Sequence, residues 1–368
     1  MRLEEFGWNC EYQDEFQDYV SQASQGCEPG RVRLARREGC ILFTARGEVE
    51  TSVAGRVQAG AGPTRAGLAD DRSRGGGGPG DGGLVAGDWV AFSAASRRVE
   101  AVLPRRSEIA RRRPGAKAER QVLAANVDVL LVVTAFGRDF RLGRLERYLL
   151  LARQSGAQPV IVLNKVDECA DPAAALRQVR PVAEGSPVVM MSALTAVGLE
   201  DLFLHIQAGH TAALVGSSGV GKSTIVNRLL AEERQRVSTV SESTRRGRHT
   251  TTDRELFVLP GGQLLIDTPG LRELQLWAPA ESVEAGFLDI AELSRGCRFR
   301  DCRHQGEPGC AVAAAIEAGD LDARRLENFH RIGRELRYLE RQSDEPAAFD
   351  ERQRIKRIHR QYRKILHR

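Results

Sequence analysis

Residues 216–223 read GSSGVGKS, a Gly-rich segment that ends in Lys and Ser. The strand candidate TAALV (211–215) precedes it, and a helical stretch (223–234) follows. Glycines in this setting let backbone N–H groups converge on phosphates, and the helix N-terminus adds its positive dipole end. The alternative is a chance Gly-rich turn, but the complete octet favours a P-loop. The predicted phosphate-binding residues are Gly216, Ser217, Ser218, Gly219, Val220, Gly221, Lys222, Ser223 and Thr224.

Within that loop, Lys222 is expected to reach the β- and γ-phosphates, and Ser223 to bind Mg²⁺. The segment DTPG (267–270) follows an apolar strand candidate, so Asp267 is expected to approach Mg²⁺ through water and the Gly270 N–H to sense the γ-phosphate. Between the P-loop and DTPG, the segment RRGRHTTTDRE (245–255) is polar and rich in threonine, as a switch segment would be. Its Thr251 is the predicted second Mg²⁺ ligand.

Two further segments predict a guanine-reading site. The segment VIVLNKVD (160–167) is a buried strand candidate that ends in Asn-Lys-x-Asp. The segment VVMMSAL (188–194) is another that ends in Ser-Ala-Leu. A carboxylate accepts both N1–H and the 2-amino group of guanine, which adenine does not offer in that arrangement. The Lys stem would cover the base, and the Ser-Ala backbone would cap O6. The predicted residues are Asn164, Lys165, Val166, Asp167, Ser192, Ala193 and Leu194.

These elements stand in an unusual order, since the base-reading segments precede the phosphate-binding ones. The termini of a compact domain often lie close together, so old ends can be joined and a surface loop opened without moving the strands. The sequence therefore predicts a circularly permuted nucleotide-binding domain that binds GTP.

Three cysteines near the C-terminus, Cys297, Cys302 and Cys310, fall within fourteen residues and enclose His304. The start of the chain is acidic and lacks the apolar segment of a signal peptide, which predicts a cytoplasmic protein. In that compartment a Cys/His cluster favours a metal site over disulfides.

The charge of the chain is unevenly distributed. Residues 1–30 carry seven acidic groups and only Arg2, whereas residues 97–120 carry nine Arg and Lys against three Glu. Residues 352–368 carry eight Arg and Lys and no acid. This asymmetry is typical either of a surface that meets nucleic acid or of solvated flanks, and composition does not separate the two.

The elements that must position these residues change character along the chain. Short strand candidates at 31–59 and 84–105 predict a small barrel of the OB type, a frequent nucleic-acid platform. Between them, residues 60–83 include ten glycines and are expected to be a flexible insertion. From residue 122, apolar strands alternate with helices, which predicts a parallel, doubly wound sheet. The strand candidates are 129–133, 160–163, 188–192, 211–215, 255–259 and 264–267.

The combined motifs resemble those of the RsgA (YjeQ) family of ribosome small-subunit-dependent GTPases. The resemblance runs from about residue 30 to 340 and includes GDWV (87–90), LPRRS (103–107), AANVD (124–128) and GRHTTT (247–252) beside the motifs above. It implies a multidomain protein: an acidic extension (1–30), an OB-fold RNA-binding domain (31–115), a permuted α/β P-loop GTPase domain (116–280), a helical zinc-binding domain (281–345) and a basic tail (346–368).

The resemblance also implies one structural Zn²⁺ held by Cys297, Cys302, His304 and Cys310, and three thiolates with one imidazole make a closed tetrahedral site. The catalytic group is less evident, because Leu271 stands where many GTPases place a Gln. His249, a position that the family shares, is the polar substitute, acting with Thr251. A surface histidine that contacts rRNA is the alternative.

By resemblance the partners are the small ribosomal subunit and its rRNA, with other assembly factors beside them, and a monomer without membrane contact is expected. Three hypotheses follow: a GTP hydrolase whose switch state governs subunit association and release, a GTP-sensing rRNA-binding protein with incidental hydrolysis, and a permuted GTPase of large-subunit assembly. Leu271 favours the second, whereas the Mg²⁺ and switch residues favour the first. The barrel and the Cys/His cluster argue against the third.

Overall fold

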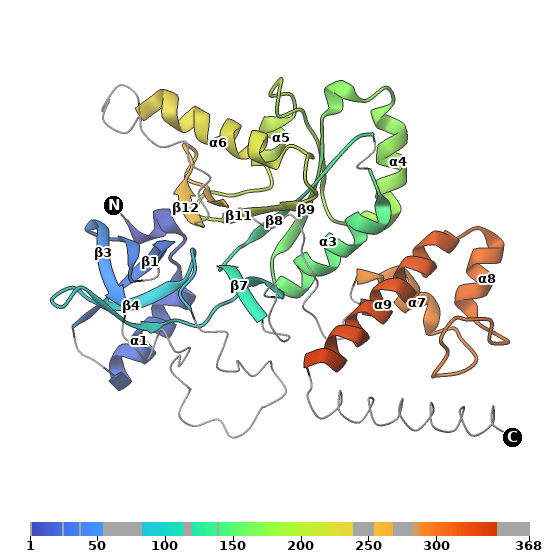
Figure 1. The fold of residues 1–368 in the computed structure, drawn as a ribbon, viewed down its shortest axis with the longest axis horizontal. Helices are drawn as coiled ribbons and strands as arrows, with labels where there is room; N and C mark the ends of the chain where they lie inside the picture. Colours follow the sequence, from blue (N-terminus) through green and yellow to red (C-terminus); the bar gives the residue numbers. More distant parts are fainter. Residues whose placement is uncertain are drawn as a thin grey trace, which may run out of the picture. The chain divides into compact units, whose positions relative to one another are not determined.

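The structure, a computed structural model, divides into two compact units: Met1–Arg111 with Gln121–Gln275, and Arg112–Arg120 with Leu276–Arg368. The first holds a barrel and an α/β sheet (Figure 1), and the second includes the Cys/His cluster. Within the described residues, no helix has the length and apolarity needed to cross a membrane. The described ranges are 2–23, 26–36, 38–53, 83–112, 120–137, 140–237, 254–267, 283–284 and 286–343.

Several predicted features fall outside those ranges. They include the catalytic candidates His249 and Thr251, Gly270 of the second switch, most of the Gly-rich insertion, and the basic tail. All of them stay predictions.

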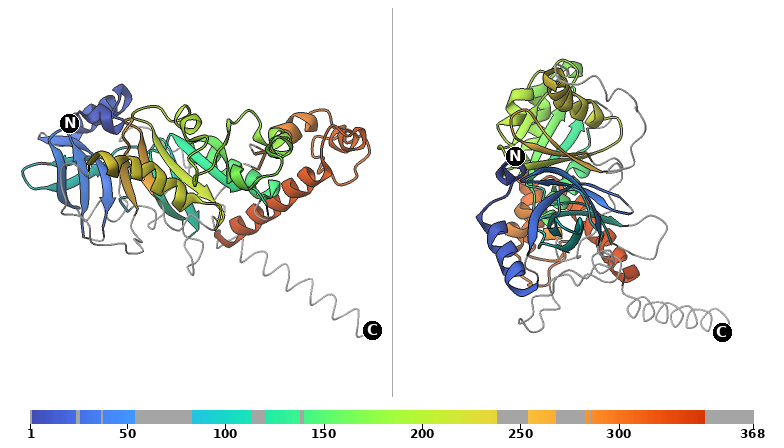
Figure 2. Two further views of the ribbon diagram at one scale, coloured as in Figure 1. Left: turned by 90° about the horizontal axis from the view of Figure 1, so that it is seen from above. Right: turned by 90° about the vertical axis from the view of Figure 1, so that its left-hand side faces the viewer.

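The barrel consists of five strands whose pairing closes on itself. The strand β1 pairs antiparallel with both β2 and β4, β2 pairs with β3, β4 pairs with β5, and β3 meets β5 in parallel. The buried side chains Val32, Leu42, Val90, Phe92 and Val99 fill its core, around which the strands curl in Figure 2. This confirms the predicted barrel. The strands are β1 Cys27–Ala35, β2 Cys40–Thr44, β3 Gly47–Val53, β4 Trp89–Ser93 and β5 Arg98–Val102.

The acidic N-terminal segment forms two helices, η1 (Leu3–Phe6) and α1 (Cys10–Ala23). Aromatic residues attach them to the barrel: Trp8 packs on Trp89 with ring centroids 4.7 Å apart, and Phe6 stacks on Phe43 at 4.5 Å. On α1 the buried aromatic side chains are Tyr12, Phe16 and Tyr19, while Glu11 and Asp14 stay exposed.

The second sheet has the strand order β10-β9-β8-β11-β13-β12. All predicted strands are present: β8 Val129–Ala135, β9 Gln158–Asn164, β10 Val188–Met190, β11 Thr211–Gly216, β12 Glu255–Val258 and β13 Leu264–Asp267. The predicted parallel pairing holds from β10 to β13 and is wrong only for the edge strand β12, which runs antiparallel to β13. The reason is the short connection between them, since a few residues can only reverse the chain, whereas parallel strands need a long crossover.

Helices cover both faces of this sheet (Figure 1). Leu199 and Leu202 of α5 and Ile225 and Leu229 of α6 pack with the strand residues on one face, and α3 and α4 lie on the other. Local signals fix the helix ends: Gly156 adopts a left-handed conformation after α3, and the Asp171 carboxylate accepts the Ala174 N–H at the start of α4. The helices are α3 Leu142–Ser155, η2 Val166–Glu168, α4 Pro172–Ala183, α5 Leu199–Phe203 and α6 Lys222–Val237.

The barrel and the α/β sheet are directly joined. Residues of β1 and β12 pair, with Leu34 opposite Glu255, so the strands of both form one continuous eleven-stranded sheet. The buried Arg31 guanidinium donates to the carbonyl of Asn126 (3.0 Å) and to the Thr211 Oγ1 (2.7 Å) at the start of β11. Because these contacts cross the predicted boundary, the bounds of the barrel and GTPase domains stay a prediction. A smaller sheet, β6 (Glu108–Arg112) with β7 (Arg120–Ala125), lies along the connecting chain.

The second unit contains α7 (Leu288–Ser294), α8 (Ala311–Ala318) and α9 (Ala323–Ser343). The Arg325 guanidinium on α9 pairs with the Asp289 carboxylate on α7, with Nη2 to Oδ1 at 2.7 Å. Phe287 and Phe329 meet edge to face at 5.5 Å. These contacts hold α7 against α9, and the segment between α7 and α8 carries the Cys/His cluster.

Candidate nucleotide site and metal centre

The predicted P-loop joins β11 to α6, as the sequence indicates. Gly216 and Gly221 have φ angles of 149° and 95°. A Cβ on Gly216 would lie 2.2 Å from the Val133 carbonyl oxygen, and one on Gly221 would lie 2.2 Å from the Asn164 Nδ2. Both positions therefore require glycine. The Lys222 Nζ donates to the carbonyls of Gly216 (2.6 Å) and Ser217 (2.5 Å), which places the ammonium group over the loop.

The first turn of α6 exposes Ser223 and Thr224. At a helix N-terminus the first backbone N–H groups have no partner within the helix, so a phosphate can reach them. Mg²⁺ can reach the two exposed hydroxyls. Asp267 lies at the end of β13, opposite Glu255 of β12. Burial, and next the charge of Glu255, raise the pKa of Asp267. A cation at this carboxylate would stabilise its charged form.

Asn164 joins the base-reading and phosphate-binding segments. Its side chain is buried at the end of β9, where Nδ2 donates to the Val220 carbonyl at 2.8 Å and Oδ1 accepts the Ala193 N–H at 3.0 Å. One amide thus ties the P-loop to the Ser-Ala-Leu segment, although the two lie far from each other in the sequence.

The remaining base-reading residues follow the ends of β9 and β10. Lys165 adopts a left-handed backbone conformation (φ 66°), after which Val166 and Asp167 begin η2 with the Asp167 carboxylate exposed. Ser192 is buried, and its Oγ accepts the Thr195 N–H at 3.2 Å. Because strands of a parallel sheet end at one edge, the structure brings these segments and the P-loop to the same edge of the sheet.

Two arginines outside the motifs also contact this site. Arg144 on α3 donates from Nη1 to the Ser217 Oγ at 2.7 Å. Arg228 on α6 donates to the carbonyls of Ala193 (3.3 Å) and Leu194 (2.6 Å). No sequence motif indicates either of them, since each is one arginine among many on a helix surface.

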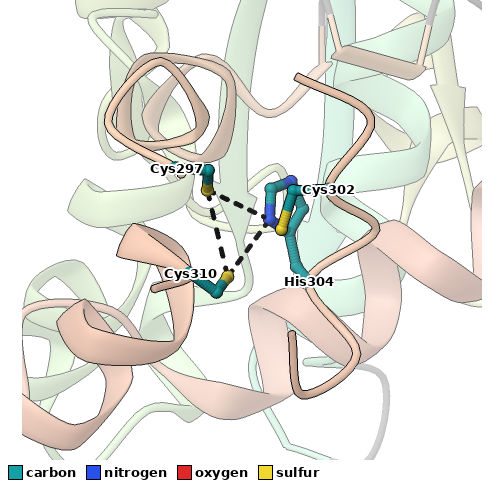
Figure 3. A group of neighbouring side chains, drawn as sticks. All are labelled: Cys297, Cys302, His304 and Cys310. Atoms are coloured by element: carbon teal, nitrogen blue, oxygen red, sulfur yellow. Dashed lines mark hydrogen bonds between the residues drawn. The ribbon is translucent and has the colours of Figure 1, made fainter. Parts of the chain in front are cut away.

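The four cluster residues point toward one another between α7 and α8 (Figure 3). Their candidate ligand atoms all lie within 4.8 Å of one another. The Cys297 Sγ lies 3.7 Å from the His304 Nδ1 and 3.9 Å from the Cys310 Sγ. The His304 Nδ1 lies 3.4 Å from the Cys310 Sγ. Local backbone contacts shape the loop: the Glu307 carboxylate accepts the N–H groups of Arg303 (3.0 Å) and Gln305 (2.7 Å).

The donor set fits zinc. The N-terminus of α8 points at the sulfurs, since Cys310 caps the helix and accepts the Ala313 N–H at 3.4 Å. Partial burial opposes ionisation of Cys297, but hydrogen bonds from the Ala311 and Val312 N–H groups and from the Cys302 and Cys310 thiols together lower the pKa of its thiol. Burial, and then the neighbouring His330, lower the pKa of His304, which favours the neutral imidazole that binds metals. Three thiols and one imidazole indicate a structural site.

The family model of the RsgA GTPase matches residues 102–277. A protein of Opitutus terrae named small ribosomal subunit biogenesis GTPase RsgA is 44% identical over 98% of this chain and 96% of its own length. A protein of the same name from Syntrophotalea carbinolica is 37% identical over 98% of this chain and 97% of its own.

Two solved structures share the fold. The crystal structure of YjeQ from Thermotoga maritima matches with a TM-score of 0.61 at 23% identity, covering 84% of this chain and 98% of that one. YloQ, described as a circularly permuted GTPase, matches with a TM-score of 0.57 at 24% identity, covering 86% and 97%. The sheet order, the assembled motifs and the full-length sequence relatives agree, and the chain belongs to the RsgA family of GTPases.

Proposed function

We propose that this protein hydrolyses GTP while it acts in late assembly of the small ribosomal subunit, and that its nucleotide state controls association and release. The observation that carries the nucleotide assignment is the position of Asn164, which hydrogen-bonds to both the P-loop and the Ser-Ala-Leu segment. The subunit assignment is supported by relatives that carry the small-subunit biogenesis name and match along nearly the whole chain.

In this proposal Lys222 and the P-loop amides bind the phosphates, and Asp167 selects guanine. Ser223 and Thr251 would bind Mg²⁺ directly and Asp267 through water, where the ion neutralises charge on the β- and γ-phosphate oxygens. The exposed hydroxyl of Ser223 and the carboxylate of Asp267 are oxygen ligands of the kind that Mg²⁺ prefers. His249 would orient the attacking water in the complex with the subunit.

The contact with rRNA is supported by the cluster unit. Its loop exposes Arg295, Arg298, Arg300 and Arg303, which flank Phe299 in the sequence, and Phe299 itself is 43% exposed. The Arg298 guanidinium lies 5.6 Å from the centre of that ring. Exposed aromatic rings among arginines are typical of surfaces that stack bases and neutralise phosphates. We infer one structural zinc ion per chain here, and a cytoplasmic monomer.

The deciding experiment measures GTP turnover by the full chain with purified small subunits, with large subunits, and alone. Small subunits should accelerate turnover at least several tens-fold, equivalent to ~2 kcal/mol or more of barrier, whereas large subunits should not. Lys222→Ala is the control that should abolish turnover. Stimulation by large subunits instead would favour the hypothesis of a permuted GTPase that acts in large-subunit assembly.

The GTP-sensing alternative, in which hydrolysis is incidental, remains the second candidate because Leu271 cannot orient a water. It predicts that subunits bind the GTP form but leave turnover unchanged. The proposed GTPase predicts tight subunit binding with a non-hydrolysable GTP analogue, weak binding with GDP, and loss of stimulation in Thr251→Ala. Equal binding in both nucleotide states would contradict the proposed switch.

A further inference from the structure

Arg228 connects the phosphate-binding helix α6 to the Ser-Ala-Leu segment, which is predicted to read the base. It lies on α6, the helix that begins with Lys222 and Ser223, and its guanidinium is half-buried. Nη2 donates to the Leu194 carbonyl at 2.6 Å and Nε to the Ala193 carbonyl at 3.3 Å. The short bond to Leu194 is the better of the two, and both are assisted by the arginine charge.

Besides Arg228, three hydrogen bonds fix the segment, one of which is the bond from the Thr195 N–H to the Ser192 Oγ. On its N-terminal side, the Ser192 N–H donates to the Val197 carbonyl at 2.9 Å, and Asn164 accepts the Ala193 N–H. Beyond Ala193, the side chain of Leu194 is 71% exposed, so apolar packing contributes little to its position. The loop also includes Ala196 with a φ of 65°, a conformation that alanine adopts at some cost. The guanidinium therefore anchors the part of the loop that side-chain burial leaves unsupported.

We propose that Arg228 is a positioning residue for guanine specificity, which holds the Ser-Ala-Leu loop in register with the phosphate-binding helix. The proposal rests on the proposed base-reading role of this loop. There, a backbone N–H group of the loop would face the 6-oxygen of guanine, where adenine carries an amino group. The N–H groups of Ser192 and Ala193 already donate to Val197 and Asn164, so the N–H group in this role is that of Leu194. An arginine that fixes the loop favours nucleotides with a 6-oxygen and contributes nothing to those without it.

The placement on α6 adds a mechanical consequence. Arg228 lies six positions after Lys222, a rise of about 9 Å along the helix. A single rigid element thus fixes both the phosphate end and the base end of the site. Loosening Arg228 should weaken GTP and GDP by the same factor, because the contact concerns the base and not the γ-phosphate.

The test compares nucleotide affinities of Arg228→Ala and Arg228→Lys in the full chain. Alanine has the higher helix propensity, so α6 itself should persist. GDP affinity of Arg228→Ala should fall about 5- to 30-fold, as expected for two lost hydrogen bonds. The affinity of the same variant for the diphosphate of 2-aminopurine riboside should change less than about two-fold, because this nucleotide lacks the 6-oxygen. Arg228→Lys should restore part of the GDP affinity, and kcat at saturating GTP should stay unchanged.

The matched control is Arg180→Ala, an exposed arginine on α4, which should leave all affinities unchanged. Two outcomes would overturn the proposal: GDP affinity of Arg228→Ala equal to that of the control, or an equal loss for GDP and the 2-aminopurine analogue, which is what a purely structural role produces. Asp167→Asn in the same assay tests the base-reading assignment separately. If that variant fails to gain affinity for xanthosine diphosphate, the base-reading assignment itself is wrong.

Discussion

The nucleotide site and the Cys/His cluster are built in opposite ways. The first draws its residues from the ends of β9, β10 and β11 and from α6, which a parallel sheet brings to one edge. The second draws all four ligands from Cys297–Cys310, one short loop between α7 and α8. One is organised by long-range backbone pairing and the other by local sequence.

This difference predicts different sensitivities. Buried hydrogen bonds such as those of Asn164 preform the nucleotide site before a ligand arrives. The cluster loop consists largely of exposed side chains, so little apolar burial offsets the entropy of ordering it. Metal binding then supplies folding free energy for the loop, as it does in small zinc domains.

The largest effect is expected from removing a metal ligand. Cys302→Ala or Cys310→Ala should reduce bound zinc from one per chain to near zero, since the loss concerns an interaction of about 10 kcal/mol or more in comparable sites. Metal analysis gives the zinc content, and limited proteolysis should show new cleavage in residues 297–310. GDP affinity should stay within about two-fold, because the two sites belong to separate compact units of the chain and share no residue.

The control for these variants is Cys10→Ala, an exposed cysteine on α1. It should keep both zinc and protease resistance. Absence of zinc from wild-type protein purified in reducing buffer would show that the cluster is not a zinc site.

The next largest effect concerns base selection. Asp167→Asn replaces the anionic acceptor for the guanine edge, so GTP affinity should fall by roughly 10²- to 10³-fold, as for two hydrogen bonds to a charged group. Xanthosine triphosphate, which offers an oxygen where guanine has its amino group, should bind better than to the wild type. Competition titrations measure both affinities. A variant that still prefers GTP would refute the assigned role of Asp167.

Asn164→Ala tests preorganisation more directly. It leaves the Val220 carbonyl and the Ala193 N–H without their partner, at a cost of about 1–3 kcal/mol for each buried group. Hydrogen exchange should accelerate in both 192–198 and 216–221, and GDP affinity should fall while zinc content stays constant. The exposed Asn227→Ala on α6 is the control. Faster exchange in only one segment would mean that Asn164 does not couple the two.

The sequence predicted the motifs and the strands of this molecule because both have local signatures. Gly216 and Gly221 follow from a fixed loop pattern, and the Cys/His cluster follows from spacing alone. Three features were not predictable in this way: the antiparallel β12, the buried Arg31 that joins the barrel to β11, and Arg228 behind the base-reading loop. Each depends on which distant element lies beside it, and a single arginine gives no sign of its partner. The catalytic candidates His249 and Thr251 stay untested predictions.

The smallest effect is expected where the barrel meets the nucleotide sheet. The Arg33 Nη2 lies 2.6 Å from the Glu255 Oε1, and Glu255 stands opposite Asp267, which is expected to face Mg²⁺ and the phosphates. Both side chains of the pair are 26% exposed, so the pair itself should contribute only about 0.5–1 kcal/mol. Removing Arg33, which also pairs with the more exposed Glu48 on the barrel, nevertheless leaves the Glu255 carboxylate without this arginine beside a site that must bind an anion.

Arg33→Met should therefore weaken GTP binding about two- to five-fold, by the order of one exposed ion pair, and more strongly at low salt than at high salt. Adding Glu255→Gln to that variant should restore most of the affinity, because the carboxylate opposite Asp267 is then neutral, while the exposed Glu48 carboxylate remains charged. Arg36→Met breaks a comparable barrel pair, Arg36–Glu50, whose side chains are 50% and 72% exposed, and it should leave GTP binding unchanged. If Glu255→Gln fails to restore binding in the Arg33→Met background, the barrel acts through packing and not through charge. The barrel would then support the geometry of the nucleotide site, as Asn164 does, and would not change its electrostatic potential.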